Sequence, residues 1–351
     1  QIAQFLNQAP FNVYPGSTFQ GTFSFTSSVP VGVVALRGLT NERGDFLMST
    51  LPVIDPAAAP GRGPVVVPHF TDGDGWITQI FLVNPTDSTL TGNLQFSDPN
   101  GAAAKVTIAG VTSDNFPYSV PGRSSHKLTT AGAAAVTASG SVRVIPAGGG
   151  IVPAAMAVFS YRRGGITVTE AGASAITGSA FRLYVESAGT TGQAGNVQTG
   201  LAVANPSSSP APVTFEITNL NGSSLGISPF TFTLQPSGQT SKFLGDIFPS
   251  LPNAFNGVVR ITTTGSGISV VGLRARYNER QDFLITTPPP SNEAAAPSGA
   301  ELLFPHIVNG ADSYGNYTTQ LILYNGTAVP RSSGYLRFLK QDGTAFILNL
   351  N

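Results

Sequence analysis

A tight turn containing glycine recurs at one spacing along the chain and constrains the fold most. The three turns are Asn100-Gly101, Asn221-Gly222 and Asp342-Gly343, which follow one another at intervals of 121 residues. Asn-Gly and Asp-Gly pairs are hairpin signals, because both central residues of a type I′ turn need a positive φ. The sequence therefore predicts a β-hairpin at the same place in each of three repeats.

The strand before each turn alternates in the same way. The inward apolar pairs are Leu94 and Phe96, Phe215 and Ile217, and Leu336 and Phe338. The residues between them are Gln95, Glu216 and Arg337, which share no charge. A period of two with a polar opposite face indicates half-buried antiparallel strands.

Two further landmarks share one offset of 237 residues. Asn41-Glu42-Arg43 corresponds to Asn278-Glu279-Arg280, and Pro68-His69 corresponds to Pro305-His306. The repeat is thus about 118 residues long, which exceeds the length of a propeller blade. Many short strands, frequent turns and little helical periodicity predict an all-β fold of tandem immunoglobulin-like β-sandwiches.

The repeat boundaries predict four segments. Residues 65–168 and 181–287 are expected to be complete β-sandwiches. Residues 1–53 are expected to be the C-terminal half of a split sandwich, and residues 301–351 the N-terminal half. Segments rich in Pro, Ala, Gly and Ser at 55–64, 170–179 and 288–299 are expected to be linkers.

The two ends of the chain complement each other in sequence. Leu350-Asn351 matches Leu234-Gln235, and the stretch Gln1–Leu6 matches Gln239–Leu244, so that only the three residues Pro-Ser-Gly are missing between them. Half a sandwich leaves an apolar face in water, so residues 301–351 need a segment equivalent to residues 1–53. The residues expected to make this joint are Gln1, Ile2, Phe5, Leu6, Phe346, Leu348 and Leu350.

Three sources of the missing half remain open. The two ends close within one chain, a neighbouring subunit supplies the half, or the chain is one period of a longer polypeptide. Linkers of about ten residues disfavour a tight ring of three domains and favour the second and third sources. Strand donation between subunits is an established way of joining proteins.

The composition restricts the class of partner. Only 10% of the residues are charged, the formal net charge is zero and there is no Cys. Such a chain lacks the basic surface that binds nucleic acid or an anionic membrane, and it has no thiolate for zinc. Its longest apolar stretch is interrupted by Arg143 and Pro146, so no membrane span is expected. A surface rich in Ser, Thr, Asn, Gln and Gly suits an extracellular protein, or one whose faces are covered by neighbours or glycans.

Two stretches carry a resemblance to a known group of proteins. "PHFTDGDGWITQIFLVNPTD" with "LQFSDPNG" is echoed by "FPHIVNG" and "YTTQLILYNGT" with "LRFLKQDG". They resemble secreted bacterial tandem-repeat proteins with immunoglobulin-like sandwiches, of the surface-fibre or adhesin-stalk type. The resemblance implies export and a structural or adhesive role at the cell surface. The middle repeat departs from the pattern, since Leu183-Tyr184 replaces Pro-His.

Few residues are candidates for chemistry. Asp72 and Asp74 in "TDGDG" are weak candidates for a calcium site, but Gly-rich hairpins also place Asp at turn positions. The carboxylates of "NERGDF" and "NERQDF" are expected to form local ion pairs in a repeated turn. We therefore expect no catalytic residue, no metal and no cofactor.

Two functions are compatible with these features. The first is a structural subunit of an extracellular filament or surface array, whose partners are copies of itself. The second is an adhesion or carbohydrate-binding module on a stalk. Sequons at Asn221, Asn316 and Asn325 make glycans possible additional partners.

Overall fold

The computed structural model of the chain describes residues 2–13, 20–56, 61–295, 301–312, 315–326 and 333–348. Almost all regular structure in these residues is β-strand. The described helices are α1 (Leu244–Ile247) and the 3₁₀ turn Ala147–Gly149. The prediction of an all-β fold is confirmed.

Residues 65–174 form two four-stranded antiparallel sheets, which we call unit 1. One sheet has the order β3 (Val65–Asp72), β10 (Ala138–Pro146), β5 (Leu90–Ser97), β8 (Asn115–Val120). The other has the order β12 (Ile166–Ser174), β11 (Ala154–Arg163), β4 (Trp76–Val83), β9 (Ser125–Thr129). A small hairpin of β6 (Val106–Ile108) and β7 (Val111–Ser113) links β5 to β8. The predicted inward residues Leu94 and Phe96 are buried between the sheets.

Residues 180–286, which we call unit 2, repeat this order strand for strand. The first sheet is β14 (Ala180–Ala188), β19 (Phe255–Thr263), β16 (Ala211–Asn219), β17 (Phe230–Leu234). The second is β21 (Phe283–Thr286), β20 (Ile268–Tyr277), β15 (Val197–Ala204), β18 (Gln239–Phe243). A short pairing of β14 with β15 joins the two, and β13 (Thr177–Gly178) and β22 (Ser291–Asn292) add short edges.

The strand order of both units differs from that of an immunoglobulin constant domain. There the first strand pairs with the second. Here the first strand pairs with the sixth of the eight sheet strands, as β3 with β10 and β14 with β19. Repeat length and alternation predict two packed antiparallel sheets, but they do not determine which strands are neighbours.

Within the described residues, the two terminal segments form strands in two short hairpins. Strands β1 (Ala35–Thr40) and β2 (Phe46–Leu51) make one hairpin, and β23 (Gly310–Asp312) and β24 (Gly315–Tyr317) make another. The first hairpin corresponds to β20 and β21 by the offset of 237 residues. Elsewhere in the described parts of the two terminal segments, the backbone is irregular and mostly exposed.

The repeated hairpin turns differ in type from the prediction. Gly101, Gly222 and Gly343 have φ values of 85°, 82° and 85°, but the Asn or Asp before each has a negative φ. Each glycine N–H instead closes a four-residue turn, onto Asp98, Asn219 and Lys340 respectively. This is a type I turn followed by a left-handed glycine, another common hairpin connection.

The segment 170–179, expected as a linker, carries the end of β12 and all of β13. Its small residues have a packing reason, because Ala171 and Ala173 are buried. A Cβ atom on Gly172 would stand 2.3 Å from the carbonyl oxygen of Thr50. The composition that indicated a linker therefore marks a place where two strands approach closely.

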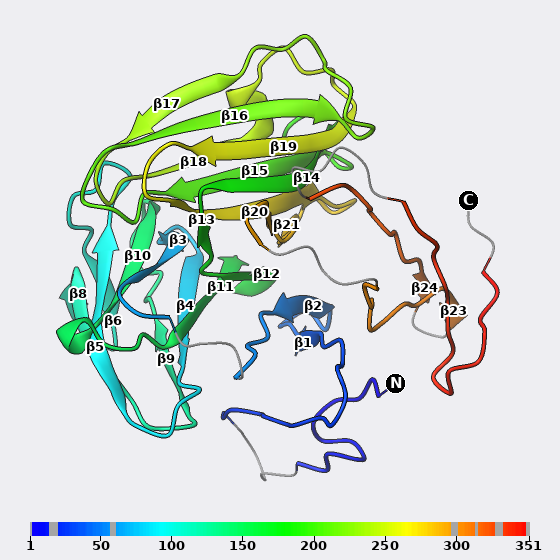
Figure 1. Cartoon of the computed structure of the whole chain (residues 1–351), viewed down its shortest axis with the longest axis horizontal. Coiled ribbons are helices and arrows are strands. Elements are labelled where there is room, and N and C mark those ends of the chain that lie inside the picture. The colour runs from blue at the N-terminus through cyan, green and yellow to red at the C-terminus, as the bar shows by residue number, and fades with distance from the viewer. Residues whose placement is uncertain are drawn as a thin grey trace.

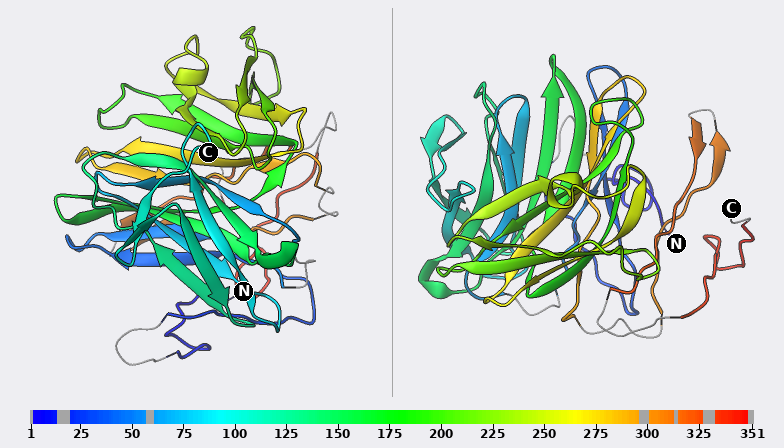
Figure 2. Two further views of the ribbon diagram at one scale, coloured as in Figure 1. Left: turned by 90° about the vertical axis from the view of Figure 1, so that its left-hand side faces the viewer. Right: turned by 90° about the horizontal axis from the view of Figure 1, so that it is seen from above.

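Units 1 and 2 and the two terminal segments are arranged around the middle of the molecule. Figure 1 shows unit 1 in cyan and green, unit 2 in green and yellow, and the blue and red terminal segments together on the remaining side. The two views of Figure 2 show the same arrangement from the side and from above.

Candidate functional site: the junctions between units

The first strand of unit 1 lies on the second sheet of unit 2. Strand β3 contacts β15, β18 and β20. The buried Ser269 Oγ lies 2.8 Å from the carbonyl oxygens of Val66 and Ile176, and the backbone N–H of Gln239 donates to the Pro99 carbonyl at 3.0 Å. Small residues on the covered face of unit 2 allow the close approach, since Ala202 and Ala204 are 2% and 0% exposed.

A histidine is part of this junction. His69 Nδ1 lies 3.1 Å from Gln239 Nε2, and its ring packs edge-on against Phe159. Burial lowers the pKa of His69 to about 4, so the ring is neutral at pH 7 and its Nδ1 accepts the hydrogen bond. His126 and His306 are exposed.

Three hairpins meet at the centre of the molecule, and we call them the hairpin hub. They are β1–β2 (35–51), β11–β12 (154–174) and β20–β21 (268–286), which hold corresponding places in the three repeats. Strand β12 lies between β2 and β21. Thr169 Oγ1 accepts from the Ile285 N–H at 2.9 Å, and Asn41 Nδ2 donates to the Thr167 carbonyl at 2.9 Å.

The hairpin turns of the first and third hub members exchange ion pairs. Arg43 pairs with Asp282 at 2.6 Å, and Arg280 pairs with Asp45 at 3.0 Å. Each Arg also pairs within its own turn, at 2.9 Å and 3.2 Å. The hydrogen bond from Arg43 lowers the pKa of Asp282. The local ion pairs predicted for the two turns are confirmed, and the structure adds the reciprocal pairs between them.

A buried carboxylate fixes the first hairpin to unit 1. Glu170 is 5% exposed at its side chain and pairs with Arg37 of β1 at 2.8 Å. Nearby, Glu42 accepts from the Thr167 N–H at 2.7 Å, and this backbone hydrogen bond lowers the pKa of Glu42. The sequence analysis missed these partners. The available signal was the position of Arg37 and Glu170 as single charges in strands otherwise free of charge.

The single Trp of the chain is part of the packing beside the hub. Trp76 stacks on Tyr161 with ring centroids 4.7 Å apart and meets the edge of Phe283 of unit 2 at 6.2 Å. Tyr161 therefore covers one face of the indole.

The calcium candidates have separate surroundings. The Asp72 carboxylate is buried and accepts from the Gly132 N–H at 2.7 Å, so it holds a loop. Asp74 is exposed at a left-handed turn position with φ 49°. Within the described residues, no three or more His, Asp or Glu side chains gather as metal ligands would.

The residues predicted to make the joint lie in the two terminal segments. Gln1 and Leu350 are outside the described residues. Ile2, Phe5 and Leu6 are 65%, 53% and 37% exposed, and Phe5 meets Phe46 edge-on at 6.5 Å. Phe346 and Leu348 are half-buried, and the Phe346 N–H bonds to the Phe338 carbonyl at 2.8 Å.

Exposed large apolar side chains concentrate in the terminal segments. Within residues 61–295 the described examples are Val111, Val136, Leu220 and Phe243. The described terminal segments carry far more, including Phe23, Phe25, Val31, Val33, Leu302, Leu303, Phe304, Leu336 and Leu339. Monomeric soluble proteins rarely expose large contiguous apolar patches, so these side chains are candidates for contact with another protein surface.

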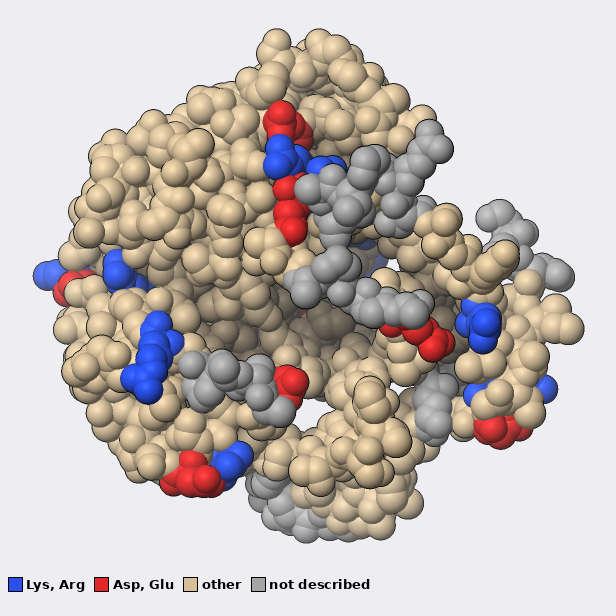
Figure 3. All heavy atoms as spheres, in the orientation of Figure 1, with Lys and Arg blue, Asp and Glu red and all other residues tan. Residues whose placement is uncertain are grey.

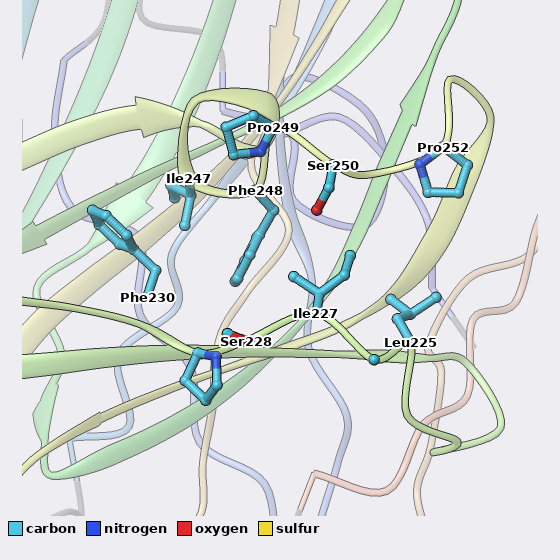
Figure 4. Close-up of a pocket in the computed structure, with 11 residues that line it drawn as sticks. Leu225, Ile227, Ser228, Phe230, Ile247, Phe248, Pro249, Ser250 and Pro252 are labelled. Carbon is cyan, nitrogen blue, oxygen red and sulfur yellow. The ribbon is translucent and has the colours of Figure 1, made fainter.

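One hollow on unit 2 is lined by no charged side chain. It lies between residues 225–230 and residues 247–252 around helix α1, and Figure 4 shows apolar side chains and prolines facing it. Ser228 and Ser250 supply its only side-chain polar groups.

Charged side chains are sparse on the face drawn in Figure 3, and most stand beside an opposite charge. None of the described helices has the length or apolar character that crossing a membrane requires. No protein-family model, curated protein or solved structure matches the chain.

Proposed function

We propose that this protein is a structural subunit of an extracellular filament or surface array, or one period of a longer repeat chain of that kind. Copies join head to tail. Residues 301–351 of one copy and residues 1–53 of the next together build a third sandwich with the strand order of units 1 and 2. The observation that carries this proposal is the concentration of exposed apolar side chains in the two terminal segments.

Each segment has the sequence of one part of a sandwich core. Leu336 is 46% exposed, whereas the corresponding Leu94 and Phe215 are 0% and 1% exposed. In the N-terminal segment, "FQGTFSF" corresponds to "FNGVVRI" of β19. Phe23 and Phe25 are 47% and 51% exposed, whereas the matching Val259 and Ile261 are fully buried. Covering these residues would stabilise a joint by about 25 cal/mol per Å² of apolar surface.

Part of the third sandwich already has its final local structure. The turn at Gly343 makes the same backbone hydrogen bonds as the turn at Gly101, including Phe346 N–H to Phe338, which matches Ala104 N–H to Phe96. A preformed hairpin loses less entropy on docking than a disordered segment does. This favours a segment that is ready to dock.

The composition fits an assembly outside the cell. With 10% charged residues and zero net charge, neighbouring copies do not repel each other. The absence of Cys means that oxidising surroundings neither add nor shuffle disulfides.

Closure of both ends within one chain is the competing assembly, and two contacts favour it. The Leu303 side chain lies 3.2 Å from where a Cβ atom on Gly32 would stand. The Tyr324 hydroxyl donates to the Arg182 carbonyl of unit 2 at 3.4 Å. A closed chain would be monomeric, so the two assemblies differ in mass.

Size-exclusion chromatography with light scattering, over rising protein concentration, and electron microscopy test the proposal. We expect oligomers or filaments from the native chain and their loss in Phe25→Asp and Leu336→Asp. Thr91→Asp, on the exposed outer face of β5, is the matched control and should assemble normally. A monodisperse 36.2 kDa monomer at high concentration would refute head-to-tail joining.

A further inference from the structure

We propose that the outer face of β4 and β9 in unit 1 is a docking face for residues 302–308 of the preceding copy. This docking face comprises Phe81, Val83 and Ser125. The proposal rests on the proposed function, because it states where the neighbour's half-sandwich is seated. It adds a contact with unit 1 to the contact with residues 1–53.

The junction between units 1 and 2 supplies the template. There the first strand of unit 1 covers Ala202 and Ala204 on β15, and His69 reaches Gln239 on β18. The repeat spacing of 121 residues makes Phe81 and Val83 the counterparts of Ala202 and Ala204. Strand pairing makes Ser125 the counterpart of Gln239, since Val83 is opposite Ser125 and Ala204 is opposite Gln239.

The same face of unit 1 is only partly covered. Phe81 and Val83 are half-buried, although their counterparts are 2% and 0% exposed. Two outward apolar side chains on a strand of a surface sheet are consistent with a further layer above them. The outer face of β4 and β9 therefore corresponds in position and apolar character to the face of unit 2 that β3 covers. On unit 1, however, no strand lies over it within the described residues.

The N-terminal segment sits on unit 1 as unit 1 sits on unit 2. Strand β2 lies against β12, as β12 lies against β21. Thr22 Oγ1 bonds to Ser125 Oγ of β9 at 3.0 Å, and the corresponding strand β10 of unit 1 contacts β18 of unit 2. The unit to which residues 1–53 belong is thus already placed, and its first strand belongs over β4.

Residues 302–308 have the sequence of that first strand. Pro305-His306 repeats Pro68-His69. Leu303 is 61% exposed, and its counterpart Val66 is 3% exposed because it is pressed into unit 2. Residues 302–308 and the partly covered face of β4 and β9 therefore correspond to the two sides of the junction between units 1 and 2. In a head-to-tail polymer, the strand comes from the copy that completes residues 1–53.

The consequence is a single junction throughout the assembly. The contact between two copies would repeat the contact between units 1 and 2. Copies would then add in one register and one direction.

A crosslinking experiment tests the docking face directly, because the chain has no Cys of its own. The full-length double variant Ser125→Cys with His306→Cys is treated with a short bismaleimide, since His69 and Gln239 meet through long side chains. The single variants are the controls. We expect the double variant to give a ladder of covalent multimers. Each single variant carries one Cys, so a crosslink can join at most two chains and give a dimer. Phe81→Asp added to the double variant should abolish the ladder, whereas Thr91→Asp should not.

Each outcome bears on a different statement. A ladder supports both the docking face and the head-to-tail assembly. Mass spectrometry could instead identify a monomer-sized product in which the Cys residues of Ser125→Cys and His306→Cys are linked within one chain. That result would show that residues 302–308 come from the same chain, and it would refute the proposed function. Filaments without any crosslink between these positions overturn the docking face and leave the proposed function standing.

Discussion

At the scale of single residues, two equivalent turns in the hub differ in one informative position. Gly44 and Gln281 occupy the same place and have φ values of 82° and 62°. A left-handed conformation costs a non-glycine residue about 1–2 kcal/mol. We expect Gln281→Gly to stabilise the protein by up to about 1 kcal/mol and Gly44→Gln to destabilise it by a similar amount. Thermal unfolding of the two variants measures both changes. A change of stability in the same direction in both variants would contradict this prediction.

The half-buried His69 makes the junction sensitive to acid. The pKa of His69 is lowered from 6.5 to about 4 in the folded protein, so the unfolded chain binds more protons between these pH values. Stability contributed by neutral His69 is therefore full above pH 6.5 and falls as the pH decreases towards 4. The loss amounts to about 3 kcal/mol at most, since one unit corresponds to about 1.4 kcal/mol. Urea unfolding at pH 7 and pH 4.5, followed by Trp76 fluorescence, measures it. His69→Gln should reduce the difference between the two pH values.

At the scale of elements, the hub depends on one buried carboxylate. Arg37→Ala would leave Glu170 buried without its partner, which costs about 1–3 kcal/mol. Arg162→Ala is the matched control, because its pair with Glu42 has both side chains more than 40% exposed. We expect hydrogen exchange of β1 and β2 to accelerate in Arg37→Ala and to stay unchanged in Arg162→Ala. Equal exchange in both variants would show that Glu170 does not hold the hairpin.

The elements also show which features the sequence could predict. Alternation at Leu94 and Phe96 predicted the strands, and Gly101 predicted the turn, because both depend on residues close together in the chain. The order of strands in each sheet depends on residues far apart in the chain. The pairing of Arg37 with Glu170 joins residues 133 positions apart. The composition around Gly172 predicts a linker, because small residues serve both a flexible segment and a close approach of two strands.

At the scale of the whole molecule, the described structure contains two complete sandwiches and two terminal segments whose described parts are mostly irregular. The period of the sequence predicts a third sandwich from these segments, and the turn at Gly343 has the predicted position. What covers Phe25 and Leu336 could not be predicted, because the same apolar pattern is satisfied by the same chain or by another copy. Stability and assembly are therefore expected to reside in different parts of the chain.

Truncation to residues 61–295 separates the two properties. These residues contain both complete sandwiches and keep the linker carboxylate Glu293, which pairs with Arg182 and Arg260. Their large apolar side chains are mostly buried, so we expect a cooperatively unfolding β protein that stays monomeric at every concentration. Light scattering and circular dichroism, with the full chain as reference, check both statements. If the truncated chain assembled like the full chain, the joint would lie on units 1 and 2. If it failed to fold, the hub hairpin β1–β2 would be needed for the stability of both sandwiches.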